Sequence, residues 1–175
     1  MHIHPQELFS EIGYALWQIQ AAEFALVHHI ALVLKEPEDL EAFEHLATKE
    51  GKRTLGQLIK ELRKHSDLPT DLDDRISAFV DERNWIAHRI FKESHSDLHS
   101  ETKASILLQR IEDLGDEALE VAKIFSDATR DWVVASGVST ERLARLERET
   151  LGQWQRQPST KAEQAEDSKP DHAPS

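Results

Sequence analysis

Apolar residues recur every three or four positions along most of the chain, the spacing that places side chains on one face of an α-helix. In the first half, this pattern predicts a long helix over residues 5–35, which ends before Pro37 because proline cannot continue a helix. It also predicts a short acidic helix or helical turn over residues 38–50. Thr54 is a typical N-cap residue, and we expect it to begin a helix that ends at His65.

The second half of the chain shows the same spacing. After a turn around Pro69, it predicts a helix over residues 71–91, a polar connection over 92–100, and further helices over 102–135 and 139–154. From residue 156 onward, Gln, Ser, Pro and charged residues predominate, and such a composition predicts disorder. The sequence therefore predicts an all-α fold, an up-and-down helical bundle with four to five main helices over residues 1–155 and a disordered polar tail over 156–175.

The composition agrees with a single helical domain in the cytoplasm. A chain of 175 residues is long enough to bury one sizeable core. It has no cysteine, which excludes a disulfide framework and a thiol site. The first predicted helix is interrupted by polar side chains and lacks the features of a signal peptide, so we expect neither export nor a membrane span.

The helix over residues 71–91 contains one charge that its pattern does not explain. Arg83 falls within an apolar stripe, where a guanidinium is costly unless it is paired with an anion or reaches a polar cleft. The apolar stripe of the first helix likewise contains a single charge, Glu23. We therefore predict that Glu23 lies near Arg83 across the core, where it neutralises the guanidinium or directs it toward a bound phosphate.

A second face of the same helix is too apolar and aromatic for an ordinary surface exposed to water. It carries Asn84, Trp85 and His88, and it continues toward Phe91. Asn84 and His88 are four residues apart, so the amide is placed to orient the imidazole. We interpret this face as a homodimer interface, with Trp85 and Phe91 as contact residues. Two His88 rings would lie close to the two-fold axis, and the arginines would flank a composite cleft in which RNA is cleaved.

The segment Arg83-Asn84-x-x-x-His88, on a late helix of a small helical chain, resembles the R-x(4-6)-H signature of HEPN proteins. The helix start over residues 54–59 also resembles members found in bacterial defence and toxin systems, and the resemblance covers about residues 7–135. It implies a helical bundle that dimerises and cuts RNA without a metal or other cofactor. It also implies that the arginine and the histidine are the catalytic pair, with the asparagine in support.

One position departs from that family. Members that a partner nucleotidyltransferase modifies often carry a tyrosine two residues after the histidine, where this chain has Ile90. The one tyrosine of the chain is Tyr14, far away in the sequence. We therefore do not expect modification of that kind.

Histidine and arginine together supply what is needed to cleave a phosphodiester by attack of its own 2′-hydroxyl. His88 would act as general base or acid, a contribution of about 10²–10⁴-fold. Arg83 would bind the non-bridging oxygens of the phosphate. The expected products are a 2′,3′-cyclic phosphate and a 5′-hydroxyl, from RNA and not from DNA.

The net charge of −12 argues against a broad grip on nucleic acid, because lysine and arginine supply most of the affinity for a phosphate backbone. If RNA is the substrate, we expect a structured or protein-presented target. An acidic exterior also suits a basic protein partner, such as an antitoxin or a regulatory protein. The candidates for a local positive surface around the motif are Lys52, Arg53, Lys60, Arg63, Lys64, Arg89 and Lys92.

Other interpretations remain open. Arg83 and His88 are equally compatible with a catalytically silent helical adaptor that uses the same face for assembly, or with a nucleotide-binding regulator. Exposure of both side chains in a cleft would favour the enzyme, whereas complete burial would favour the adaptor. His95 and His99 have the spacing of metal ligands on a helix but no assured third ligand, so no metal site is predicted. Trp17 is interpreted as a core or interface anchor.

Overall fold

The computed structural model describes residues 5–137 of the chain. Of the described residues, those up to Trp132 form one compact unit, and residues 133–137 belong to a second unit. The predicted helix over residues 139–154, the predicted domain boundary at residue 155 and the predicted disordered tail over 156–175 all lie outside the described residues.

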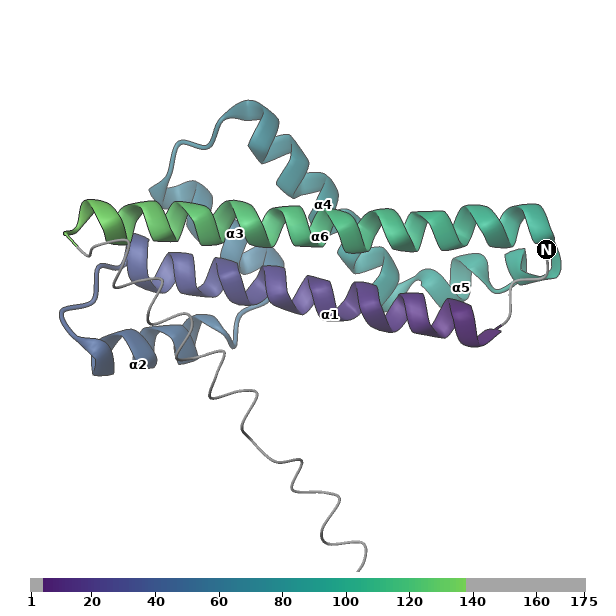
Figure 1. Cartoon of the computed structure of the whole chain (residues 1–175), viewed down its shortest axis with the longest axis horizontal. Helices are drawn as coiled ribbons and strands as arrows, with labels where there is room; N and C mark the ends of the chain where they lie inside the picture. The colour runs from purple at the N-terminus through teal and green to yellow at the C-terminus, as the bar shows by residue number, and fades with distance from the viewer. Residues whose placement is uncertain (1–4, 138–175) are drawn as a thin grey trace, which may run out of the picture. The chain divides into compact units, whose positions relative to one another are not determined.

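The described residues are helical almost throughout, and none of them forms a strand, which confirms the predicted all-α fold (Figure 1). The first helix, α1, spans Pro5–His29 and continues without a break as a π-helix, η1, over Ile30–Leu34. The helices that follow are α2 (Leu40–Glu50), α3 (Leu55–His65), α4 (Thr70–His88), α5 (Ile90–Ser94), the 3-10 helix η2 (Asp97–His99) and α6 (Glu101–Ala135).

Helices α2 and α3 each begin with a side chain that caps the first turn. The Asp39 carboxylate accepts a hydrogen bond of 2.8 Å from the Ala42 backbone N–H at the start of α2. At the start of α3, Thr54 and Gln57 form a reciprocal capping box, which confirms Thr54 as the N-cap. The Thr54 cap was predicted from the sequence because capping depends on residues only three positions apart, whereas Asp39 was not predicted as a cap.

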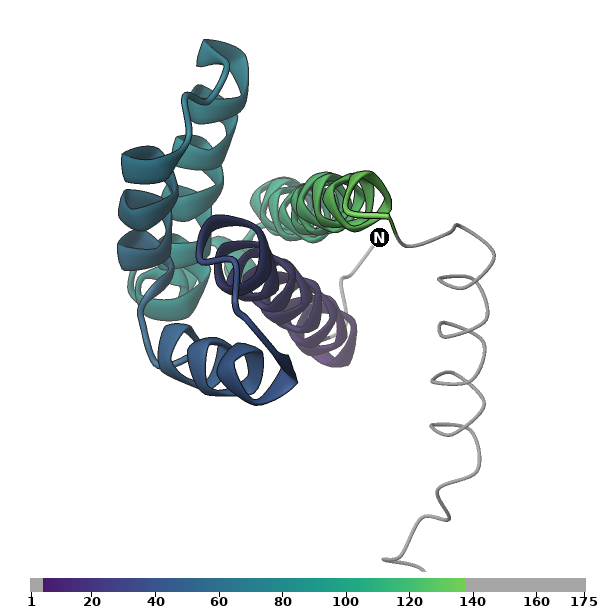
Figure 2. The ribbon, with the colours of Figure 1, turned by 90° about the vertical axis from the view of Figure 1, so that its left-hand side faces the viewer.

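The long helices α1 and α6 lie side by side and run in the same direction (Figures 1 and 2). Gly115 of α6 faces Ala15 of α1, and a Cβ built on Gly115 would lie 3.6 Å from the Ala15 Cα. Further along, the His29 Nδ1 lies 3.0 Å from the Thr129 hydroxyl oxygen, and burial lowers the pKa of His29. The two helices can be parallel because α2 to α5 carry the chain back between them.

Helix α4 runs antiparallel to α6 along a seam of two ion pairs. Arg75 of α4 forms a two-point contact with Glu117, at 2.6 and 2.8 Å. Two turns later, Arg110 of α6 donates two hydrogen bonds of 2.8 Å to Glu82. The residue numbers rise along α4 as they fall along α6, so the two pairs also set the register of the helices.

The core is formed by one face each of α1, α3, α4 and α6, and its most deeply buried side chains include Leu26, Ile30, Leu58, Leu62, Ile76, Phe79, Trp85 and Ile111. Within residues 5–137, no helix has both the length and the apolar character needed to cross a membrane.

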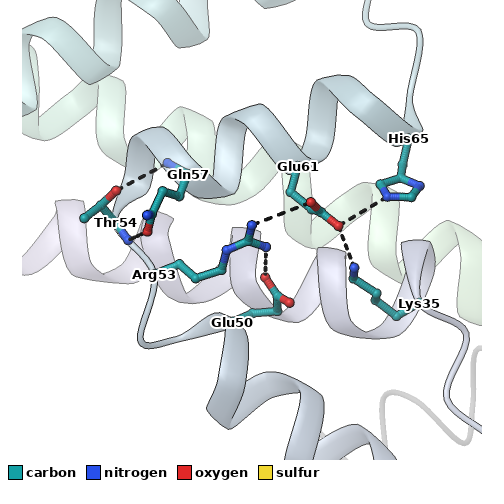
Figure 3. A network of polar contacts seen from close by, with 7 residues as sticks. All are labelled: Lys35, Glu50, Arg53, Thr54, Gln57, Glu61 and His65. Carbon is teal, nitrogen blue, oxygen red and sulfur yellow. Dashed lines mark hydrogen bonds and ion pairs between the residues drawn. The ribbon is translucent and has the colours of Figure 1, made fainter.

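A network of charged side chains joins Lys35, which follows η1, to α3 and to the loop that precedes α3 (Figure 3). Glu61 of α3 accepts a hydrogen bond of 2.5 Å from Lys35 and lies 3.2 Å from the His65 ring. Arg53 bridges Glu61, at 3.6 Å, and the buried Glu50, at 2.6 Å. Glu50 can be buried as an anion because this arginine neutralises it.

Candidate functional site

The Arg83 guanidinium lies between α4 and α1. Its Nε donates a hydrogen bond of 2.9 Å to the Glu23 carboxylate. The proximity of Glu23 and Arg83 that the sequence predicted is therefore confirmed. Both side chains are about one-quarter exposed, at 26% for Arg83 and 27% for Glu23, so the pair reaches the surface rather than being sealed in the core.

Asn84 adds a second contact to the same guanidinium. Its side-chain oxygen accepts a hydrogen bond of 3.4 Å from the Arg83 NH1 group. The sequence predicted that Asn84 would orient His88, and the structure corrects this, since Asn84 contacts its neighbour Arg83 instead. The remaining Arg83 nitrogen, Nη2, makes no hydrogen bond to any residue from 5 to 137, so its N–H groups can donate to a ligand.

His88 is exposed and is the last residue of α4. Its ring makes no hydrogen bond or ion pair with any residue from 5 to 137. The predicted helix over residues 71–91 ends here, three residues early, because Arg89 leaves the helical conformation at φ −121° and ψ −20°. The chain then enters the short helix α5, where Phe91 is 84% exposed. The imidazole is therefore accessible at a helix end, next to a turn.

Trp85 was predicted as a dimer-interface residue, and the structure places it in the core of its own chain, where it is 1% exposed. The Arg110 guanidinium of α6 lies over the indole ring, 3.6 Å from its centroid. The indole Nε1 is buried and has no hydrogen-bond partner among the residues that the structure describes. Arg110 of α6 thus covers Trp85, and a dimer cannot use Trp85 without first separating these helices. Phe91 remains available to a partner.

Arg110 is the residue of this region that sequence reasoning missed. A signal was present in the charges of the two helices: Arg75 and Glu82 are seven residues apart on α4, and Arg110 and Glu117 are seven apart on α6, in the same order of arginine first and glutamate second. Such a pattern fits two antiparallel helices joined by two ion pairs. It can be recognised only once the two helices are known to be neighbours.

A pocket of about 490 Å³ opens along this seam. Its lining consists of Arg75, Ala78, Phe79, Glu82, Arg110, Asp113, Leu114 and Glu117. Hydrogen bonds that Arg75 and Arg110 donate to the carboxylates of Glu117 and Glu82 raise the pKa values of the two arginines, so both are held as neutralised pairs. The pocket does not include Arg83 or His88, and its paired charges leave little to attract an anion.

Some of the cationic side chains expected around the motif form ion pairs with carboxylates, and others are exposed. Arg53 is bound in the network of Glu50 and Glu61, and Arg63 pairs with Asp73 at 2.6 Å. The four lysines, Lys52, Lys60, Lys64 and Lys92, are exposed. Arg89, which follows His88 in the chain, is exposed, and its Nη1 lies 3.9 Å from the Glu93 carboxylate.

Metal ligands do not gather in the part of the chain that the structure describes, where no three His, Asp or Glu side chains are placed to hold an ion. The chemistry that the described site offers is that of an oriented guanidinium and an accessible imidazole. The guanidinium can bind a phosphate, and the imidazole can accept or donate a proton.

Comparisons with protein-family models, with curated proteins and with solved structures found no match to this chain.

Proposed function

We propose that this protein is a metal-independent endoribonuclease of the toxin or defence type, with Arg83 and His88 as its catalytic residues. The supporting observation is the geometry of Arg83. Glu23 and Asn84 hold the guanidinium from two sides and leave one edge free, while His88 lies exposed at the end of the same helix. A guanidinium held in this way binds phosphate oxygens with little loss of conformational freedom.

In the proposed reaction, the free edge of Arg83 binds the non-bridging oxygens of an RNA phosphate and stabilises the charge that develops on them. His88 removes the proton from the 2′-hydroxyl, and that oxygen attacks the phosphorus. The bond to the 5′-oxygen then breaks, and protonated His88 returns the proton to the departing oxygen. The products are a 2′,3′-cyclic phosphate and a 5′-hydroxyl, and His88 ends in its initial protonation state.

The spacing of the two residues sets a requirement on the substrate. Five positions correspond to about 140° around a helix, so Arg83 and His88 diverge at their Cα atoms. The long, flexible arginine side chain can span part of this divergence. A bent or unpaired phosphodiester that wraps around the end of α4 would meet both groups, which agrees with the expectation of a structured or protein-presented RNA.

The proposal is tested by incubating the full chain with total RNA and with transfer RNA in the presence of EDTA, followed by analysis of the new ends. We expect cyclic-phosphate ends, with the rate reduced at least about 100-fold by Arg83→Ala and by His88→Ala. Two matched controls separate catalysis from folding. Arg75→Ala removes another paired arginine of α4, and His45→Ala removes another exposed histidine; both should retain activity.

The pairing of Arg83 with Glu23 also supports a second function, a catalytically silent helical adaptor. In that case the ion pair joins α1 to α4, and His88 is a surface residue. Folded wild-type protein that leaves every RNA intact, or cleavage that survives both alanine substitutions, would contradict the ribonuclease and favour the adaptor. Cleavage of DNA at a comparable rate would exclude the 2′-hydroxyl mechanism.

A further inference from the structure

Helix α1 carries an exposed row of large apolar side chains on a face that residues 5–137 leave uncovered. Phe9 is 69% exposed, Trp17 is 70% exposed and Phe24 is 65% exposed. Leu16 lies between them and is 36% exposed. With the exposed Gly13 and Gln20, these residues share one side of the helix at a spacing of three and four positions. We call this set of six residues the α1 stripe.

The spacing of the residues in the α1 stripe is the same in both directions along the helix. The steps between Phe9, Gly13, Leu16, Trp17, Gln20 and Phe24 are four, three, one, three and four residues. The midpoint lies between Leu16 and Trp17. A two-fold axis at that midpoint, perpendicular to the helix, would therefore bring an aromatic residue opposite an aromatic residue and the glycine opposite the glutamine.

We propose that the α1 stripe is a homodimer interface in which two copies of α1 pack antiparallel. Phe9 packs on Phe24 of the second copy, and Leu16 and Trp17 lie at the two-fold axis beside their symmetry mates. Such a contact is isologous, since each residue of a pair meets the other in both copies. It closes after two subunits and leaves no stripe exposed.

The side chains of the α1 stripe fit this arrangement. A Cβ built on Gly13 has no other atom within 4 Å, so a second helix can approach closely there, with Gln20 of the second copy filling the space. Phe24 is held in place by the His28 ring, whose centroid is 3.8 Å away. A rigid aromatic anchor of this kind loses little conformational entropy on binding.

The charges of the protein also favour this face for self-association. Two copies with a net charge of −12 repel each other, yet the α1 stripe contains no Asp, Glu, Lys or Arg. Antiparallel packing also places the N-terminus of each α1 beside the C-terminus of the other, where the helix dipoles attract. The proposal does not depend on the ribonuclease, because Arg83 and His88 are not part of the α1 stripe.

The apolar area is large enough to form the centre of a stable dimer. Each aromatic side chain offers roughly 150–250 Å², so the exposed parts of Phe9, Trp17 and Phe24 amount to roughly 400 Å² per chain. A standard interface buries roughly 800 Å² per partner, with aromatic anchors at its centre and a polar rim around them. The polar residues that flank the α1 stripe supply that rim.

Sedimentation velocity of the full chain tests the interface. We expect the wild type to have a molar mass in solution of twice the 20.0 kDa of one chain. The Trp17→Asp variant should have the mass of a monomer and an unchanged helix content. Phe91→Asp is the matched control, because Phe91 is 84% exposed but lies on α5. It should remain a dimer.

Cross-linking tests the antiparallel register. The chain has no cysteine, so single variants can be made without background. A short bismaleimide should link Phe9→Cys to Phe24→Cys when the two variants are mixed, and should link neither variant to itself, because identical positions lie about 22 Å apart in this register. A monomeric wild type overturns the proposal. So does a dimer that Phe91→Asp dissociates and Trp17→Asp does not, or a dimer in which each variant cross-links to itself.

Discussion

Glu61 is the residue whose ionisation the fold controls most clearly. Hydrogen bonding to Lys35, with further attraction from Arg53 and His65, lowers the pKa of Glu61 from its ordinary 4.5 to about 2 (Figure 3). Its side chain is 13% exposed, so these cations are only partly screened by water. The folded state therefore holds this carboxylate charged in conditions where the unfolded chain would protonate it.

This difference in pKa makes stability depend on pH. Because the folded pKa lies below the unfolded one, the stabilisation is present in full above about pH 4.5 and is lost as the pH falls toward 2. One pKa unit corresponds to about 1.4 kcal/mol, and contact with solvent reduces the total, so we expect Glu61→Gln to cost about 1–2 kcal/mol at neutral pH. The measurement is urea unfolding of wild type and variant at neutral and acidic pH.

Glu44→Gln provides the comparison, since Glu44 is exposed on α2. It should change the free energy of unfolding little at any pH. An effect of Glu61→Gln that stays constant down to about pH 2 would show that the network contributes packing rather than charge.

At the scale of elements, α4 is held to α6 by two similar ion pairs in different surroundings. Arg75 and Arg110 both make two-point contacts with glutamates, and both are partly exposed, at 39% and 43%. Only Arg110 also lies over the Trp85 ring. An exposed ion pair contributes about 0–1 kcal/mol, whereas a guanidinium stacked on an indole adds about 1 kcal/mol or more.

We therefore expect Arg110→Ala to lower the free energy of unfolding by about 2 kcal/mol and Arg75→Ala by less than about 1 kcal/mol. Chemical denaturation measures both. A double-mutant cycle with Glu82→Ala separates the ion pair from the ring contact, because the part that survives loss of Glu82 belongs to Trp85. Equal costs for the two arginines would show that stacking on Trp85 adds nothing.

The element boundaries also show which features are local. The N-cap at Thr54 was predictable because its partner, Gln57, is three residues away. The end of α4 at His88 was not, because the apolar spacing continues into Ile90 while the backbone turns at Arg89. That turn lets α5 lead into α6, and its position depends on where α6 must pack.

At the scale of the whole molecule, the charge of −12 limits how RNA can be bound. A protein with six to ten phosphate contacts loses about 10³–10⁵ in affinity when salt rises from about 50 to about 200 mM. The proposed site makes one or two contacts, so we expect a loss of less than about tenfold over the same range. Fluorescence anisotropy with the His88→Ala variant measures binding without cleavage, and a loss near 10³ would reveal a wider cationic surface.

The sequence by itself determined the all-α architecture, the approximate extent of the described helices and the pairing of Glu23 with Arg83. Each of these follows from helical periodicity, or from the high cost of leaving a charge unpaired in an apolar stripe. Neither cause requires knowledge of how the helices are arranged.

The tertiary structure alone decided which apolar surfaces stay exposed. Trp85 and Trp17 both lie on apolar faces in the sequence, yet α6 covers the first and leaves the second 70% exposed. Periodicity identifies an apolar face but not the helix that covers it, because that depends on chain connections spanning tens of residues. For the same reason, the place of Arg110 over Trp85 became visible only in the folded chain.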